Sequence, residues 1–183
     1  LAATTGAAWA ADGPTTRTGA YLGGSFGAVD TQTRAVGLTP IDDPAAGRAA
    51  RLRAGYWLTP HWGVEVSYTR LDGIEQTFSS GTFRARGETL AVSGLGRLSF
   101  AERWALVGKV SLNGTRVRDD GSDGATAGFE KFRGRRGNLV APGLSLEYGL
   151  TDRLAITLEA EPLGSGGEKL HLGYGGVGLR WSF

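Results

Sequence analysis

Ser165 and His171 are the two residues whose types suggest nucleophilic catalysis. An activated serine needs a base within hydrogen-bond reach and a third group that orients the base. These two residues flank the predicted end of the last hairpin, and their spacing does not put both on one strand. We therefore interpret His171 as a histidine at the rim of the fold and expect no catalytic residue.

Two other motifs suggest ligand binding but lack the spacing that it needs. The stretch 173–178 reads G-x-G-x-x-G, which must open a helix to bind a dinucleotide, yet only Leu179 to Phe183 follow it. We interpret these glycines as permitting a parity change between Tyr174 and Val177, or a close strand contact. The loop residues Asp119, Asp120 and Asp123 lack the EF-hand spacing. No cofactor and no metal are expected.

Composition narrows the class of protein. The chain has 183 residues, 31 glycines and no cysteine, so disulfide and thiolate chemistry are excluded. The 20 basic and 18 acidic residues are dispersed along the chain, whereas a nucleic-acid-binding surface has clustered basic residues. Residues 1–10 are small and uncharged and end in an A-x-A pattern, which we interpret as a signal-peptide remnant. Residues 11–183 then form one domain.

Hydrophobic residues recur at every second position in seven segments. Successive side chains of a strand point to opposite faces, so this period predicts strands. A weaker segment within 17–29 makes an eighth. Within each of the seven segments, the residues that share a face are, in chain order, Leu52, Ala54, Tyr56 and Leu58; Trp62, Val64, Val66 and Tyr68; Leu90, Val92 and Leu98; Leu106, Val110 and Leu112; Val140, Leu144, Leu146 and Tyr148; Leu154, Ile156 and Leu158; and Val177, Leu179, Trp181 and Phe183.

Charged residues occupy the opposite face of these segments, five positive and four negative. A soluble β-sandwich with its charges in water remains an alternative. The near balance of charge favours a closed barrel, with charges paired inside and the apolar face in lipid, because burying unpaired charge is costly. The predicted interior charges are Arg51, Arg53, Glu65, Arg97, Lys109, Glu147, Glu159, Glu161 and Arg180. Of these, Arg97, Glu147 and Arg180 are expected in one layer, close to the turns.

Short and long connections alternate along the chain. The segments 58–62, 100–104 and 150–154 repeat one plan: an apolar residue, two turn residues, a basic residue or histidine, and an apolar residue. Outer-membrane barrels have short periplasmic turns and longer extracellular loops, and the sequence has this asymmetry. The predicted long loops are 30–48, 72–84, 116–134 and 162–169.

The tryptophan residues fall at one end of the predicted barrel. Trp57, Trp62 and Trp104 flank the short turns, and Trp181 lies near the chain end with Phe183. Tryptophan prefers the membrane–water interface, where its ring is apolar and its N–H is hydrated. These five residues are therefore predicted to form a periplasmic aromatic rim, with the alternating final strand and Phe183 as an assembly signal.

That final strand, with 55–60, 63–68 and 146–151, makes the chain resemble the OmpA-like transmembrane domain and its relatives of the OmpX and NspA kind. The resemblance implies an eight-stranded up-and-down barrel with both termini in the periplasm, four surface loops and a polar interior rather than an open channel. Glu65, Arg97 and Glu147 match positions of interior ionic residues in that family. An arginine that belongs to the proposed gating cluster of OmpA corresponds to Thr157 here, so gating is not expected to carry over.

The sequence therefore predicts an all-β, eight-stranded antiparallel transmembrane barrel of the bacterial outer membrane, a monomer with a structural or surface-interaction role. A small low-conductance pore is the first alternative, and a hydrolase that modifies lipid A is the second. The expected partners are outer-membrane lipid and lipopolysaccharide, the barrel-assembly machinery, and host or surface ligands at the loops, but no nucleic acid. Predicted contacts to lipopolysaccharide phosphates come from Lys131, Arg133, Arg135 and Arg136.

Overall fold

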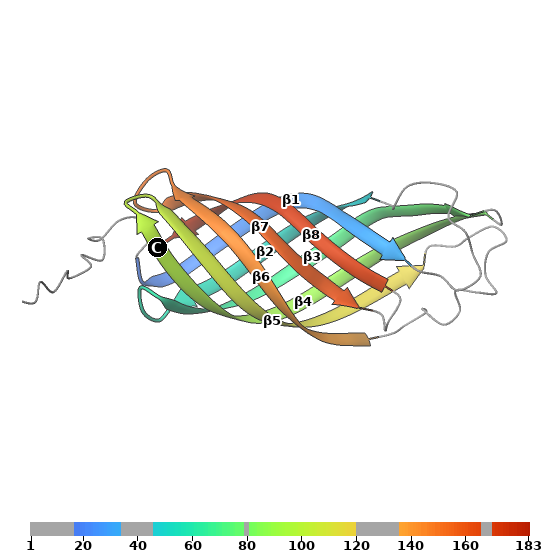
Figure 1. Cartoon of the computed structure of the whole chain (residues 1–183), viewed down its shortest axis with the longest axis horizontal. Coiled ribbons are helices and arrows are strands. Elements are labelled where there is room, and N and C mark those ends of the chain that lie inside the picture. Colours follow the sequence, from blue (N-terminus) through green and yellow to red (C-terminus); the bar gives the residue numbers. More distant parts are fainter. Residues whose placement is uncertain (1–16, 34–45, 79–80, 120–135, 166–169) are drawn as a thin grey trace, which may run out of the picture.

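The computed structural model describes residues 17–33, 46–78, 81–119, 136–165 and 170–183, which form one closed antiparallel β-barrel (Figure 1). Each strand pairs with its neighbours in sequence, and β1 closes the barrel on β8. In this part of the chain no helix is long and apolar enough to cross a membrane. The predicted fold class is confirmed. The strands are β1 (Gly19–Thr33), β2 (Ala46–Trp57), β3 (Trp62–Phe78), β4 (Gly81–Ala101), β5 (Trp104–Asp119), β6 (Arg136–Gly149), β7 (Leu154–Ser165) and β8 (Leu170–Ser182).

Three short turns and the C-terminus lie at one end of the barrel, which we call the turn end; the opposite end is the loop end (Figure 1). Of the three turn segments that share one sequence plan, 58–62 and 150–154 also share the same hydrogen bonding. Thr59 Oγ1 accepts a bond from the Trp62 amide at 3.0 Å, and Thr151 Oγ1 accepts one from the Leu154 amide at 3.0 Å. A threonine side chain that bonds the backbone ahead of it favours a tight turn.

The third turn, between β4 and β5, is built differently. Ala101 pairs directly with Trp104, and the register shifts between Ser99 and Ala101, which leaves Phe100 as an extra residue. An extra residue in one strand bends it and increases its twist. The resemblance of 100–104 to the other two turns is therefore one of sequence alone.

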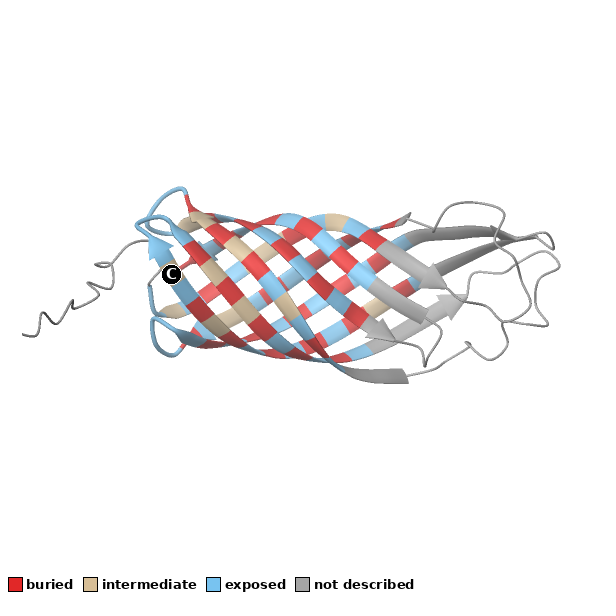
Figure 2. Ribbon diagram, in the orientation of Figure 1, coloured by how far each residue is buried: buried red, intermediate tan, exposed pale blue. Residues whose placement is uncertain are grey.

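Burial alternates residue by residue along the strands, which gives the checkered pattern of Figure 2. On β3, Val64 and Val66 are exposed while Glu65 and Ser67 are buried. Most of the large apolar side chains are exposed, and the buried set is mostly polar or charged. This is inverted relative to a soluble protein, whose apolar residues are the buried ones.

The boundaries predicted for three loops, 30–48, 72–84 and 116–134, were wrong because strands continue past the apolar segments. The predicted loop 72–84 is mostly hairpin, since β3 runs to Phe78, β4 starts at Gly81, and the two pair up to Phe78 and Gly81. Likewise, β1 continues to Thr33 and β5 to Asp119. Backbone hydrogen bonds hold a ladder together without apolar side chains, so a hydrophobic pattern marks the lipid-facing length and not the end of pairing.

Inward glycines make room for the largest interior side chains. A Cβ on Gly55 would collide with the Tyr21 ring, and one on Gly23 would come within 2.5 Å of Arg53 Nε. On β8, a Cβ on Gly178 would meet the Gly24 carbonyl oxygen at 2.5 Å. Of the two interpretations of the glycines in 173–178, close strand contact is therefore the correct one. Tyr174 lies inside and Val177 outside without a change of parity.

Candidate functional site

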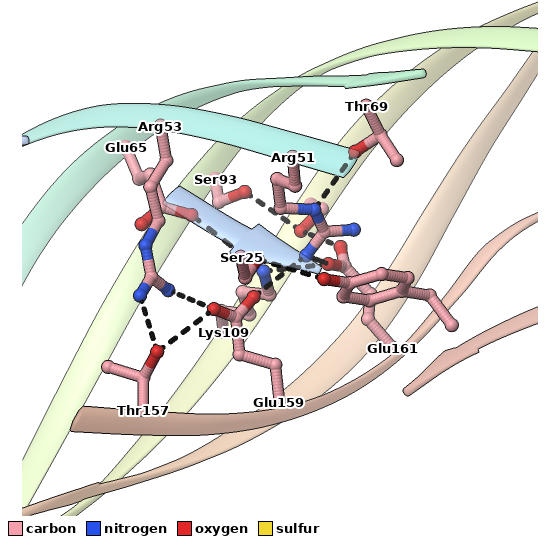
Figure 3. A network of polar contacts seen from close by, with 12 residues as sticks. Ser25, Arg51, Arg53, Glu65, Thr69, Ser93, Lys109, Thr157, Glu159 and Glu161 are labelled. Carbon is pink, nitrogen blue, oxygen red and sulfur yellow. Dashed lines mark hydrogen bonds and ion pairs between the residues drawn. The ribbon is translucent and has the colours of Figure 1, made fainter. Parts of the chain in front are cut away.

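The nine charged residues that share one face in the sequence lie inside the barrel. All nine are buried, and among the residues whose burial is described no other charged side chain is. They come from seven strands, β2 to β8, with β2 and β7 contributing two each. Figure 3 shows how most of them meet across the lumen.

Six of these charges form one network with equal numbers of positive and negative groups. Glu161 lies between two cations, 2.6 Å from Lys109 Nζ and 2.8 Å from Arg51 Nη1. Glu159 likewise contacts Arg51 at 3.2 Å and Arg53 at 2.6 Å (Figure 3). Glu65 completes the network 3.7 Å from Lys109. Three positive and three negative groups, all buried, therefore neutralise one another inside the barrel.

Uncharged side chains supply further hydrogen bonds to this network. Tyr21 donates to Glu65 at 2.7 Å, and Ser111 donates to Glu161 at 2.6 Å. Arg53 donates to Thr157 at 2.7 Å. Buried charges are tolerated when their remaining donors and acceptors are paired, and these bonds contribute to that. Thr157 thus takes part in the network as an acceptor.

Tyr21 and Tyr174 were missed as members of the interior by the sequence analysis. Tyr174 donates to Ser25 at 2.8 Å, and the Arg51 guanidinium lies 4.2 Å from the centre of its ring. The one feature of the sequence that could have placed these two tyrosines inside is that each lies an even number of residues from the inward-facing residues of its own strand. On β1 that signal is weak because glycines interrupt the alternation.

The layer predicted for Arg97, Glu147 and Arg180 contains one ion pair rather than three mutual contacts. Arg180 and Glu147 pair at 3.1 Å. The Arg97 guanidinium instead stacks 3.5 Å from the centre of the Trp57 ring, and its Nη1 donates to the Arg17 carbonyl at 3.2 Å. Arg97 is therefore the one positive charge in excess of the four acidic groups.

Trp57 does not lie on the outer aromatic rim, so that prediction was wrong. Its side chain is 2% exposed, inside the barrel between Arg97 and Tyr21. The reason is parity: Trp57 falls on the same face of β2 as Arg51 and Arg53, whereas Tyr56 falls on the outer face. The other predicted rim residues, Trp62, Trp104, Trp181 and Phe183, are exposed at the turn end.

Apolar layers cover the charged network at both ends. Towards the turn end, Tyr21, Trp57, Leu95 and Val107 form one buried cluster. Towards the loop end, the second buried cluster consists of Val29, Ala49, Leu71, Leu163 and Tyr174. An eight-stranded barrel has an interior just wide enough for side chains to fill. The described interior side chains thus place the six-charge network between two apolar clusters, with Arg97, Glu147 and Arg180 beside the cluster at the turn end.

Several predicted residues fall where side chains are not described. Lys131, Arg133 and Arg135 lie outside the described residues, as do the calcium alternative's Asp120 and Asp123 and the signal-peptide segment 1–10. Arg136 begins β6, and only its backbone pairing with Arg116 is described. Ser165 and His171 are register partners between β7 and β8, again in backbone terms only.

A closed barrel with an even number of strands, an apolar outer face and a polar interior is typical of outer-membrane proteins. The model of the outer membrane protein beta-barrel domain matches residues 1–183. The chain belongs to this family. Because barrels of this family lie in the outer membrane, the exposed apolar face is the face that contacts lipid, as the sequence predicted. No curated protein sequence matches the chain.

Solved outer-membrane barrels share the fold at low sequence identity. Neisserial surface protein A aligns with a TM-score of 0.63 at 14% identity, covering 91% of this chain and 98% of that one. OprG from Pseudomonas aeruginosa aligns with a TM-score of 0.56 at 14% identity, covering 94% and 99%. Ail of Yersinia pestis aligns with a TM-score of 0.55 at 16% identity, covering 91% and 100%. At these identities the likeness concerns the fold alone.

Proposed function

We propose that this protein is a monomeric, non-conducting scaffold that holds four loops at the bacterial surface, with its turn end in the periplasm. The observation that carries the proposal is the neutral network of six charges between two apolar layers. An ion that entered the lumen would have to replace internal ion pairs and then cross both apolar clusters. Rigid walls with a closed interior suit the display of loops better than transport.

Support for a surface-interaction role comes from proteins of this fold. Ail, named for attachment and invasion, has also been solved with the heparin analogue sucrose octasulfate. In the sequence of the present chain, Lys131, Arg133 and Arg135 precede Arg136, the first residue of β6. We assign these residues to the phosphates of lipopolysaccharide, since guanidinium groups bind phosphate through charge-assisted hydrogen bonds.

Accessibility on intact cells tests the orientation. A short epitope inserted at 124 should bind antibody on intact cells, and the same epitope at 152 should bind only after the outer membrane is permeabilised. The reverse result, or equal binding at both sites, would contradict the display of these loops at the surface.

The contact with lipopolysaccharide needs its own test. Charge reversal of Lys131, Arg133 and Arg135 should weaken retention of lipopolysaccharide on the purified barrel, whereas reversal of Arg103 and Arg153 in the turns should not. Equal retention by both variants would remove this part of the proposal. Displacement by heparin but not by lipopolysaccharide would assign the basic segment to a host polyanion instead.

A further inference from the structure

Charged residues on the outer wall of the barrel gather on three strands. On β1 and on β5 to β8, the outward strand residues whose burial is described are all uncharged. The outward charged residues with described burial lie instead on β2, β3 and β4, which are consecutive in the wall, so they share one surface. We call this surface the arginine patch; it consists of Arg48, Arg70, Asp72, Arg86 and Glu88.

The ladders of the barrel place opposite charges next to each other in the patch. Arg48 of β2 is the register partner of Asp72 on β3. Arg70 of β3 is the register partner of Glu88 on β4. Opposed residues on one face of a sheet have Cβ atoms about 5 Å apart, so each acidic residue lies beside an arginine of the next strand. With three arginines and two acidic residues, the patch carries a net positive charge.

A β-bulge brings Asp72 close to Arg86 as well. The register shifts between Leu71 and Ile74, where two residues of β3 face the single Arg86 of β4. A bulge of this kind changes the direction of a side chain. Asp72 contacts Arg70 Nε at 3.3 Å and Arg86 Nε at 3.9 Å. One carboxylate therefore lies between two guanidinium groups that come from neighbouring strands.

Both guanidinium groups are accessible from outside the barrel. The side chains of Arg70 and Arg86 are 61% and 64% exposed, and that of Asp72 is 53% exposed. An exposed ion pair contributes little to stability, so an arginine can exchange such a contact for a stronger acceptor at small cost. Each guanidinium also has five N–H donors, more than its contact with Asp72 requires. The two arginines can therefore bind one anion together.

The patch lies at the loop-end border of the lipid-facing surface. Tyr68 precedes Arg70 by two positions and Leu90 follows Glu88 by two positions, and both are exposed on the apolar face. At the turn end of β3 the corresponding border is formed by Trp62, an exposed aromatic residue. The two borders thus differ in chemistry. Lipid headgroups lie at such borders, and clustered basic residues there attract anionic headgroups.

From this arrangement we propose that the arginine patch is a binding site for the phosphomonoester headgroup of an anionic lipid in the leaflet at the loop end. A phosphomonoester has three acceptor oxygens and close to two negative charges, so it accepts charge-assisted hydrogen bonds from both Arg70 and Arg86. A phosphodiester has fewer such oxygens and a single charge, and it binds more weakly. The acyl chains of the bound lipid lie along Tyr68 and Leu90.

This site is separate from the basic segment that precedes β6. It lies on the barrel wall and is made of strand residues. The proposal rests on the proposed function for one point only, the orientation that makes the leaflet at the loop end the outer leaflet. Recognition of the phosphomonoester itself does not depend on which end of the barrel faces the cell exterior.

Lipid retention by the purified barrel tests the site. The barrel is placed in phosphatidylcholine nanodiscs with equal small amounts of phosphatidic acid, a phosphomonoester, and phosphatidylglycerol, a phosphodiester, and native mass spectrometry counts the lipids that stay bound. Phosphatidic acid should be retained in preference to phosphatidylglycerol. Arg70→Gln with Arg86→Gln should lower this retention about tenfold, because hydrogen bonds to a charged group are lost. Arg103→Gln with Arg153→Gln removes the same charge from exposed turns and should leave it unchanged.

A variant that conserves charge separates a binding site from a generally basic surface. Arg70→Lys with Arg86→Lys keeps both positive charges but loses the planar fork of donors. Retention of phosphatidic acid by this variant should fall between that of the unaltered barrel and that of the glutamine variant. Heat-modifiable gel mobility shows that each variant is folded before its lipids are counted.

Three results would overturn the site. The first is equal retention of phosphatidic acid and phosphatidylglycerol by the unaltered barrel, which would make the patch a generally basic surface. The second is equal retention of phosphatidic acid by the two glutamine variants. The third is displacement of phosphatidic acid by inorganic phosphate, which would make the ligand a soluble anion. Both leaflets of the nanodisc contain the same lipids, so these results concern the site alone, whereas a reversed epitope result contradicts the proposed orientation.

Discussion

Replacing Glu161 by glutamine isolates one charge of the interior network. Glu161 accepts from Arg51 at 2.8 Å, from Lys109 at 2.6 Å and from Ser111 at 2.6 Å. Glutamine keeps the shape of the side chain but leaves the six-residue network with one positive charge in excess. Among the described residues, Glu65 at 3.7 Å is then the remaining acidic partner of Lys109.

The expected loss of stability is large. Breaking a buried ion pair by removing one partner costs about 3–5 kcal/mol, because the remaining charge is uncompensated. The change from Lys109 to methionine removes the matching positive charge and leaves Arg51, Arg53, Glu65 and Glu159 in balance. The double variant should therefore recover at least about 2 kcal/mol relative to the sum of the two single changes.

Urea unfolding of the lipid-inserted protein, followed by tryptophan fluorescence and heat-modifiable gel mobility, measures these free energies. The control is Glu102→Gln in the exposed third turn, which should change stability by no more than about 0.5 kcal/mol. If Glu161→Gln unfolds at the same midpoint as Glu102→Gln, or if the two single changes simply add, the network does not hold the lumen as described.

Three further predictions concern assembly, the lipid face and the packing of the lumen. Deletion of Phe183 should leave secretion intact but reduce insertion, seen as loss of heat-modifiable mobility in outer-membrane fractions; normal levels would contradict the assembly signal. Val66→Arg should cost about 2–4 kcal/mol near the bilayer midplane, and more than Ser67→Arg, whose side chain enters the polar lumen; equal unfolding midpoints would argue against opposite faces. Gly55→Ala should cost about 1–3 kcal/mol through its collision with the Tyr21 ring, whereas Gly94→Ala, with nothing within 4 Å of its Cβ, should be silent.

The sequence predicts the lipid face and the lumen face because both depend on the period of two. That period is a property of each strand alone, so it placed Glu65 inside and Val66 outside without knowledge of any partner. It also placed Trp57 inside. The assignment of Trp57 to the rim was wrong because the preference of tryptophan for interfaces was allowed to outweigh parity.

The pairing of charges across the lumen was not predictable in the same way. Which cations meet Glu159 and Glu161 depends on the closure of β1 on β8 and on the stagger between strands, and neither leaves a local signal. The ends of the strands were misjudged because ladders continue without apolar residues.

Single-channel recording in planar bilayers tests the central claim, the closed lumen, most directly. The purified barrel in concentrated KCl should give no resolved conductance steps, because the neutral network and its two apolar layers leave no path for an ion. Reproducible steps from the unaltered protein that disappear when the barrel is heat-unfolded would contradict the account and make the protein a small pore.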